Sequence, residues 1–215
     1  LVFYQFGKMQ MLLGEDRAAE QACSEAILTF QKLADETPHN ADYRFNLAQA
    51  FNELGKVMEQ MDRSSDAEDS YRQALAITRK LDADYPGRYR GWLAGRLNNI
   101  GIVLCDRGKL AEAESMHRES MAIRAENPHK LFLSVESLIN LGVVLSQQTS
   151  RLFEAEKTLR QGLEIQSKVV GSSPSDCEQQ SRFATAHFIL AGVLANTSRL
   201  PEAERSYRKA LAIQA

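Results

Sequence analysis

The sequence predicts an all-α protein built as a solenoid of about five stacked helix pairs. Three observations predict this fold class. An eleven-residue phrase recurs five times, a pair of residues precedes each copy at a nearly fixed distance, and prolines follow most copies at a fixed distance. Repetition with a period of tens of residues is typical of arrays in which each unit packs mainly against its neighbours.

The recurring phrase reads AEDSYRQALAI from Ala67 to Ile77 and AERSYRKALAI from Ala203 to Ile213, so these two copies are nearly identical. In every copy a glutamate follows the first alanine. The five copies begin at Ala19, Ala67, Ala113, Ala155 and Ala203. The starts are 42 to 48 residues apart, which predicts five repeats along the chain.

An apolar residue followed by a small one lies twelve residues before each phrase, or thirteen in the fourth repeat. These pairs are Phe6-Gly7, Leu54-Gly55, Ile100-Gly101, Leu141-Gly142 and Leu190-Ala191. Small residues at a fixed offset predict that the two helices of a repeat cross closely, with Gly55 against Ala67. The additional residue of the fourth repeat falls within Ser146–Arg151.

Prolines mark where the second helices have ended, because proline cannot continue a helix interior. Pro38, Pro86 and Pro174 each lie 19 residues after the key alanine, whereas Pro128 lies 15 after it. The second helix of the third repeat is therefore expected to be about one turn shorter. Pro201 instead suits the first turn of the last helix, where its missing N–H is not needed.

The expected elements follow in order. The first helix covers about 2–13, a turn covers 14–16, and the second helix ends near Glu36. Asn40 is expected to cap the third helix, whose apolar stripe is Leu47, Phe51, Leu54 and Met58. Later turns are expected at Met61–Ser65, 85–87, 106–108, 127–128, 146–151 and 171–175, and the later first helices carry similar stripes.

This pattern resembles the tetratricopeptide repeat family. Repeat two carries the family residues most completely, with Phe51, Leu54, Gly55, Met58, Ala67, Tyr71 and Ala74. Repeat three departs from them at His117 and Ser120, and repeat one has Cys23 at the aromatic position. The resemblance implies a right-handed superhelix of antiparallel helix pairs.

The resemblance covers the whole chain as a single array over residues 1–215, with repeats at about 1–38, 39–86, 87–128, 129–174 and 175–215. Both ends are expected to be cut from a longer protein. The period exceeds the usual ~34 residues, and Tyr-Arg leads into two repeats, at Tyr43 and Tyr89. In this respect the chain is similar to the long-helix arrays attached to some bacterial serine/threonine kinases.

The charge and composition of the chain exclude some classes of binding partner. The formal net charge of −2 argues against nucleic acid or a membrane surface as the main partner. No apolar run approaches the ~20 residues of a membrane span. The three cysteines lie in different repeats and imply no disulfide framework. A reducing compartment, the cytoplasm, fits best.

The sequence offers no catalytic constellation, no phosphate-binding glycine-rich loop and no cluster of histidines, so we expect no enzyme, cofactor or metal site. Glu114 and His117 have one-turn ligand spacing, but packing explains His117 and His187 better. Cys105 is read as an apolar contact rather than a reactive thiol. Arg88, Arg90 and Arg96 are read as a solvated face, with contact to an acidic partner as the alternative.

The resemblance implies that the first helices line a concave groove. Carried over onto this sequence, the groove residues are Asn52, Lys56, Asn98, Ile102, Ile139, Asn140, Val143 and Phe188. The groove is thus polar near repeat two and apolar from Ile102 onward. Either a bound segment covers these apolar residues, or the long helices of neighbouring repeats do.

The expected function is a scaffold that binds a peptide or a partner helix in this groove. One alternative is a regulatory region of a larger bacterial signalling enzyme, such as a serine/threonine kinase. Another is a structural self-association module that pairs end to end through Ala210, Leu211 and Ile213. A clamp for a C-terminal carboxylate is disfavoured, because Glu136 and Asn140 stand where the family has two cations.

Overall fold

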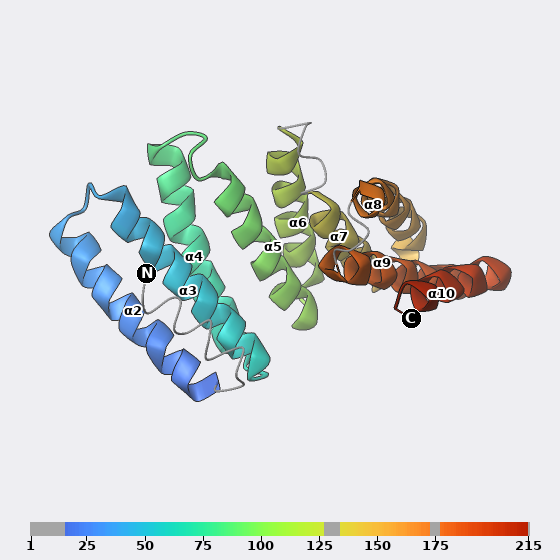
Figure 1. Ribbon diagram of the computed structural model, residues 1–215, viewed down its shortest axis with the longest axis horizontal. Coiled ribbons are helices and arrows are strands. Elements are labelled where there is room, and N and C mark those ends of the chain that lie inside the picture. The colour runs from blue at the N-terminus through green and yellow to red at the C-terminus, as the bar shows by residue number, and fades with distance from the viewer. Residues whose placement is uncertain (1–15, 127–133, 173–176, 215) are drawn as a thin grey trace. The chain divides into compact units, whose positions relative to one another are not determined.

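The computed structural model describes residues 16–126, 134–172 and 177–214. Every regular element in this part of the chain is helical, and Figure 1 shows the helices in chain order. They are α2 (Asp16–Glu36), α3 (Ala41–Gln60), α4 (Ser64–Asp84), α5 (Arg90–Asp106), α6 (Leu110–Ala125), α7 (Val135–Ser146), the 3₁₀ helix η2 (Thr149–Arg151), α8 (Leu152–Ser172), α9 (Cys177–Asn196) and α10 (Leu200–Gln214). The all-α solenoid class is confirmed.

The predicted helix ends agree closely with the structure. The side chain of Asn40 caps α3 by accepting hydrogen bonds from the amides of Asp42 (3.0 Å) and Tyr43 (3.3 Å), and Pro201 lies in the first turn of α10. The additional residue of the fourth repeat falls where η2 forms. The helix expected over 2–13, Pro128 and Pro174 lie outside the described residues.

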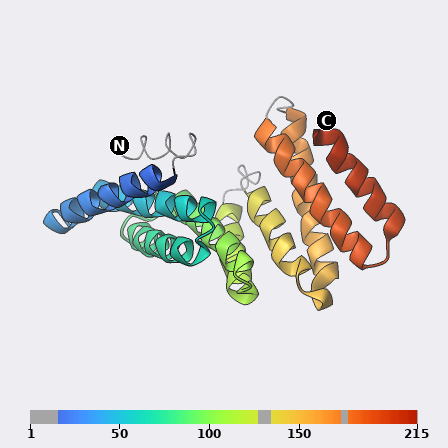
Figure 2. The same cartoon turned by 90° about the horizontal axis from the view of Figure 1, so that it is seen from below.

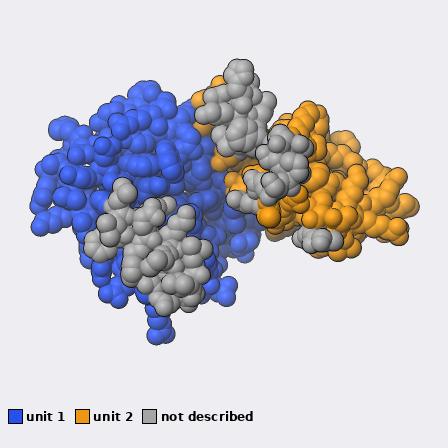
Figure 3. All heavy atoms as spheres, in the orientation of Figure 1, with its two compact units in different colours: residues 1–109 blue, residues 110–215 orange. Residues whose placement is uncertain are grey.

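The chain divides into two compact units, residues 1–109 and 110–215, which Figure 3 colours separately. The boundary falls between α5 and α6, so the two helices of the expected third repeat belong to different units. The single array over residues 1–215 stays a prediction, and each unit is described by itself.

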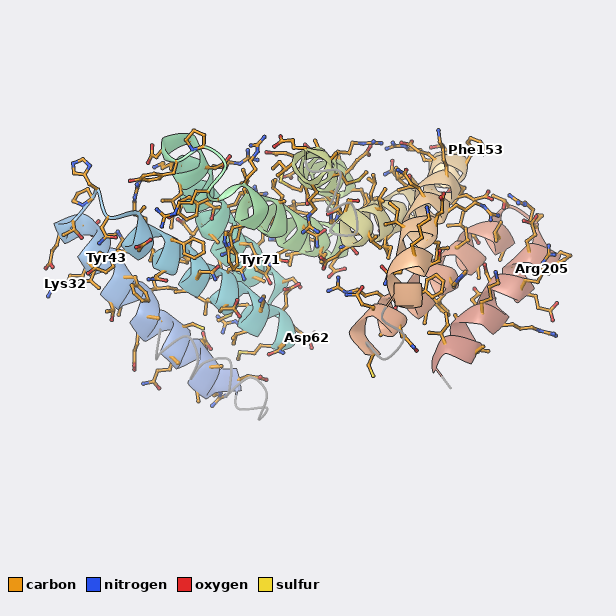
Figure 4. All side chains as sticks on the ribbon, turned by 45° about the horizontal axis from the view of Figure 1, so that its top comes forward. Lys32, Tyr43, Asp62, Tyr71, Phe153 and Arg205 are labelled. Carbon is orange, nitrogen blue, oxygen red and sulfur yellow. The ribbon has the colours of Figure 1, made fainter. Side chains whose placement is uncertain are left out.

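In unit 1 each helix packs on the next: α2 on α3, α3 on α4 and α4 on α5. The close crossing of α3 and α4 depends on Gly55. A Cβ atom built there would lie 2.6 Å from Cε1 of Tyr71, too close for any side chain without a shift of the ring. Tyr71, which Figure 4 labels among the helices of this unit, therefore makes the nearest contact rather than the expected Ala67.

In unit 2 the helices also pack in sequence from α6 to α10, and the first helices α7 and α9 contact each other as well. Figure 2 shows α8, α9 and α10 side by side. A Cβ atom at Gly142 would lie 2.5 Å from Cδ2 of Leu159, the position equivalent to Tyr71. In these two repeats the small residue of the pair thus makes room for the large residue four places after the key alanine.

The same tight turn joins the two helices in three repeats. Asp62, Gly108 and Ser198 have positive φ angles of 56°, 71° and 61°, a conformation that closes the end of a helix. The amide of the following residue, Arg63, Lys109 or Arg199, then donates to a carbonyl five residues earlier, at 2.8 to 2.9 Å. In all three repeats a basic residue thus leaves the turn at the same point.

Candidate protein-binding surface

The groove residues expected two places before each Leu-Gly-type pair are mostly buried. Asn52, Asn98 and Ile139 are only 2%, 1% and 6% exposed, whereas Phe188 is 61% exposed. We call this place in each repeat the inner position. The structure thus separates Phe188 from its three equivalents.

In unit 1 the inner position joins neighbouring first helices through hydrogen bonds. Nδ2 of Asn99 on α5 donates to Oδ1 of Asn52 on α3 over 2.8 Å. Nδ2 of Asn52 in turn donates to Oε1 of Glu53 over 3.0 Å, and Nζ of Lys56 donates to the same oxygen over 2.9 Å. Arg96 of α5 donates to Gln49 of α3. These polar groups therefore already have hydrogen-bond partners within unit 1.

Burial, with a further contribution from the negative charge of Glu53, raises the pKa of the Cys23 thiol to about 11. Cys23 is 6% exposed, and its side chain belongs to a small core with Ala19 and Val57. A thiol with this pKa stays protonated near neutral pH and is a poor nucleophile. Cys105 is likewise buried.

In unit 2 the inner position is apolar. Cγ1 of Ile139 lies 3.5 Å from the place of a Cβ atom on Gly162 of α8. Ile139 also shares one hydrophobic core with Leu159 and Leu163 of α8 and with Ala186 and Leu190 of α9. The contact between α7, α8 and α9 is therefore made by burial rather than by hydrogen bonds.

The residue directly after each pair has a similar exposure in all the described repeats, unlike the inner position. We call it the open position. Its occupants in the described repeats are half-buried: Lys56, Ile102, Val143 and Gly192. Asn140, which precedes the pair of the fourth repeat, is also half-buried. Of the eight expected groove residues, those that a ligand can reach are thus Lys56 and Ile102 in unit 1, and Asn140, Val143 and Phe188 in unit 2.

The structure does not place the three arginines of the predicted solvated face, Arg88, Arg90 and Arg96, on one exposed surface. Arg96 is 4% exposed and lies over the Trp92 ring, with 5.7 Å between Cζ and the ring centroid. Arg90 pairs with Asp82 and Arg88 with Asp42, each over 3.0 Å. The reading was wrong for Arg96 because its charge is used between first helices, which a sequence pattern does not reveal.

The two histidines lie among packed helices. His117 is fully buried, and His187 is 8% exposed with its ring 4.8 Å from that of Phe183. Burial, aided by the charge of Lys209, lowers the pKa of His187. Among residues 16–126, 134–172 and 177–214, no group of three His, Cys, Asp or Glu residues could hold a metal ion. None of the described helices is long and apolar enough to cross a membrane.

The sequence reading missed the role of the glutamate that follows each key alanine. In four repeats this glutamate accepts a basic side chain from the turn of the next repeat. The pairs are Arg63–Glu20 (2.9 Å), Lys109–Glu68 (2.9 Å), Arg151–Glu114 and Arg199–Glu156 (2.7 Å). We call these pairs the inter-repeat clasps.

Each clasp has the same construction. The basic residue lies four places before the key alanine of its own repeat, and the arginines among them also bind an acid three places further on: Asp66, Glu154 or Glu202. In three of the clasps the glutamate also accepts an arginine one turn later on its own helix: Arg72, Arg118 or Arg160. The signal was present in the sequence as an acid and a base at fixed offsets.

Two of the clasps lower the pKa of their glutamate. Hydrogen bonds from Arg151, and then from Arg118, lower the pKa of Glu114 to about 2 despite its partial burial. Burial of Glu68 alone would raise its pKa, but hydrogen bonds from Lys109 and Arg72 lower it on balance. Both glutamates therefore stay ionised at neutral pH, and the clasps are ion pairs.

Part of the chain matches a known protein family. Residues 93–171 match the model of the family described as "Tetratricopeptide repeat". This segment of the chain therefore matches tetratricopeptide repeats. The chain matches none of the curated proteins with which it was compared.

Solved structures show the same repeat fold. Nearly identical TPR-like repeats named for kinesin light chain from Podosopora anserina superpose with a TM-score of 0.69 at 17% identity, over 100% of this chain and 94% of that one. RapI without ligand gives 0.70 at 18% identity, over 98% and 52%. The Rap conjugation gene regulator of plasmid pLS20, in complex with the Phr* peptide, gives 0.65 at 17% identity, over 96% and 51%.

At these identities the superpositions show the fold alone. Members of the tetratricopeptide repeat family commonly mediate protein–protein interactions, and the repeat fold is generally a non-catalytic scaffold. The kinase-associated bacterial subtype stays a prediction.

Proposed function

We propose that the chain is a non-enzymatic scaffold that binds a peptide or a partner helix along the open positions of its first helices. The observation that carries this proposal is the even accessibility of that position. Lys56, Ile102, Val143 and Gly192 are all half-buried, whereas the inner position beside them is buried in three of four repeats. Within each unit, accessible residues on a packed floor suit an extended or helical ligand.

The two units offer different chemistry to a ligand. On unit 1, the open positions are the apolar Ile102 and Lys56, whose ammonium group already pairs with Glu53, so this part favours a segment that carries both apolar and polar groups. On unit 2, Val143 favours a segment that buries an apolar side chain. The Rap regulator that superposes on this chain was solved with a peptide, which supports a peptide ligand for this fold.

A peptide library displayed on phage and selected on the whole chain tests the proposal. Peptides that the wild type selects should bind Ile102→Asp or Val143→Asp at least tenfold more weakly, because a charge replaces apolar contact area. Phe153→Ala is the matched control, since Phe153 is 81% exposed and, as Figure 4 shows, points away from the helices. Equal binding to the wild type and both aspartate variants would contradict the site.

A further inference from the structure

Two adjoining hollows lie on unit 2, along α8, α9 and α10, which Figure 2 shows side by side. The first has a volume of about 310 Å³ and the second of about 300 Å³. Arg160 of α8 lines both hollows, and so do Ser206 and Lys209 of α10. We call these three residues the polar rim. The two hollows therefore meet at the polar rim.

The two hollows differ in chemistry away from this rim. The first contains the apolar side chains of Leu163, Phe183 and Leu190. Leu163 and Leu190 belong to the hydrophobic core of unit 2, and Phe183 packs against that core. The second hollow is also lined by Glu202 and Arg205. A ligand at the polar rim would thus have an apolar floor on one side and a polar surface on the other.

The polar rim offers hydrogen-bond donors. Arg160 donates from Nε to Glu156 over 2.8 Å and from Nη2 to Glu202 over 3.3 Å. These two bonds hold the guanidinium in place and leave its Nη1 group available to donate. Lys209 is exposed, and no ion pair among the described residues includes it. Ser206 adds a hydroxyl on a side chain that is only 7% exposed.

A buried imidazole lies beside these donors. His187 lines the first hollow and is 8% exposed, and its Nδ1 atom has no hydrogen-bond partner among the described residues. Its equivalents in the other described repeats are the apolar Phe51, Leu97 and Leu138, which need no such partner. Buried polar atoms without a partner are uncommon, so Nδ1 of His187 independently indicates a ligand at this hollow.

The unpaired cation is also particular to the fifth repeat. Lys209 lies six places after its key alanine, and the equivalent residues are Gln73, Glu119 and Gln161. After burial, the charge of Lys209 is the next cause that lowers the pKa of His187, so the ammonium group and the imidazole are close neighbours. The fifth repeat thus combines a cation and an imidazole that no other described repeat has at these positions.

The first hollow is not a surface on which a neighbouring repeat stacks. Helix α9 packs on α8 and α7, so a helix stacked in the same way on the fifth repeat would lie on α10 and α9. The hollow has α8 as a further wall. It is also separate from the open positions, because Gly192 lies nine residues after Phe183 and therefore on the opposite face of α9.

We propose that the two hollows bind a small organic phosphate, whose phosphate group accepts hydrogen bonds from the polar rim and whose apolar body lies on the floor of the first hollow. A phosphate monoester has three strong acceptor oxygens, one for each donor of the rim, whereas a carboxylate has two. The acids that line the hollows do not exclude an anion, because Glu164 already pairs with Lys168 and Glu202 with Arg199. This site goes beyond the proposed function, since it does not use the open positions.

Nuclear magnetic resonance of the whole chain with labelled histidine tests the proposal, with phenyl phosphate as the probe. The ring signal of His187, assigned by its loss in His187→Leu, should shift saturably. The bound phosphate offsets the charge of Lys209, so the lowered pKa of His187 should rise towards its ordinary value of 6.5. The other charged groups of the first hollow are Arg160 and Glu164, which stay ionised throughout and do not produce this rise.

Lys209→Gln should weaken the binding of phenyl phosphate at least fivefold, because it removes the unpaired cation. Glutamine is the natural residue at this place in repeats two and four, and circular dichroism should match the wild type. Lys209→Arg keeps the charge and should bind within about twofold of the wild type. Arg208→Gln is the matched control: it removes the same charge from the next position, where Arg208 pairs with Glu204 and lines neither hollow. It should leave binding unchanged, as should Val143→Asp at an open position.

Two further probes test the two parts of the ligand. Inorganic phosphate should bind at least tenfold more weakly than phenyl phosphate, because it leaves the apolar floor uncovered. Benzoate should also bind more weakly, because a carboxylate leaves one donor without an acceptor. A His187 signal that does not respond, or equal binding by Lys209→Gln and Arg208→Gln, would overturn the proposal. Inorganic phosphate or benzoate bound as tightly as phenyl phosphate would also overturn it, by showing an adventitious ion only or a carboxylate site.

Discussion

The two units use different chemistry at the same structural position. In unit 1 the inner position is Asn52, which exchanges hydrogen bonds with Asn99 and Glu53. In unit 2 it is Ile139, which lies in an apolar core with residues of α8 and α9. Both residues are almost completely buried. In these two repeats the position is therefore buried in both cases, whereas the kind of contact differs.

This difference has a physical consequence. Hydrogen bonds are directional, so the amides of unit 1 favour one relative position of α3 and α5 over its neighbours. Apolar contacts are not directional, so unit 2 depends on shape, with Gly162 admitting Ile139. Substitutions that exchange the two chemistries should therefore have unequal costs.

The largest loss of stability is expected when the asparagine of unit 1 is placed at the inner position of unit 2. Ile139→Asn removes apolar burial and leaves an amide without partners in the core, and should lower the free energy of unfolding of that unit by about 3–4 kcal/mol. Urea denaturation measures the change. Val143→Asn, at the half-buried open position of the same helix, is the control and should cost less than about 1 kcal/mol. Equal costs would mean that the inner position is not the buried one.

A smaller loss of stability is expected when an apolar side chain is placed at the inner position of unit 1. Asn52→Leu leaves Asn99 without its acceptor and should cost about 1–3 kcal/mol. Adding Asn99→Leu removes the unmatched donor and should recover at least half of this loss. A double variant no more stable than Asn52→Leu would show that the hydrogen bond itself, and not the unmatched amide, determines the cost.

The inter-repeat clasps should give the smallest effect. Arg151→Met should lower the free energy of unfolding at pH 7 by more than Arg208→Met does, because it removes an arginine that pairs with the partly buried Glu114 and leaves Arg118 to balance that charge. Arg208→Met removes an exposed pair one turn apart and should cost less than about 0.5 kcal/mol. Chemical denaturation of both variants beside the wild type makes the comparison.

The cost of Arg151→Met should also depend on pH. The folded-state pKa of Glu114 is about 2, below the ordinary value of 4.5, so its stabilising contribution is complete above about pH 4.5. That contribution is lost as the pH falls from about 4.5 towards about 2, and the difference between wild type and variant should shrink over this range. A difference that stays constant across it would show that Arg151 acts through packing.

The fold could be predicted from the sequence because it rests on local and periodic signals. Asn40 caps α3, Pro201 lies in the first turn of α10, and the apolar stripes of the first helices set which face packs inward. The contact of Gly55 was predicted only to within one turn: its nearest neighbour is Tyr71 rather than Ala67, because the helices cross at an angle that spacing does not reveal.

The candidate site was harder to predict, because accessibility depends on which helix covers which. Carrying groove positions over from the family treats Asn52, Ile139 and Phe188 as equivalent, yet their exposed fractions range from 2% to 61%. The role of the repeated glutamate was missed for a related reason. Its partners lie about forty residues further along the chain, and only the stacked structure brings the two together.

The clasps also bear on how such a chain can grow. Every internal repeat supplies the base of one clasp and the acid of the next, and the two residues come from the same stretch of six residues around its key alanine. A gene segment that encodes one repeat therefore encodes both halves of the junction. Duplication of that segment creates a new junction that is already complementary, so the number of repeats can change without any compensating mutation in the neighbours.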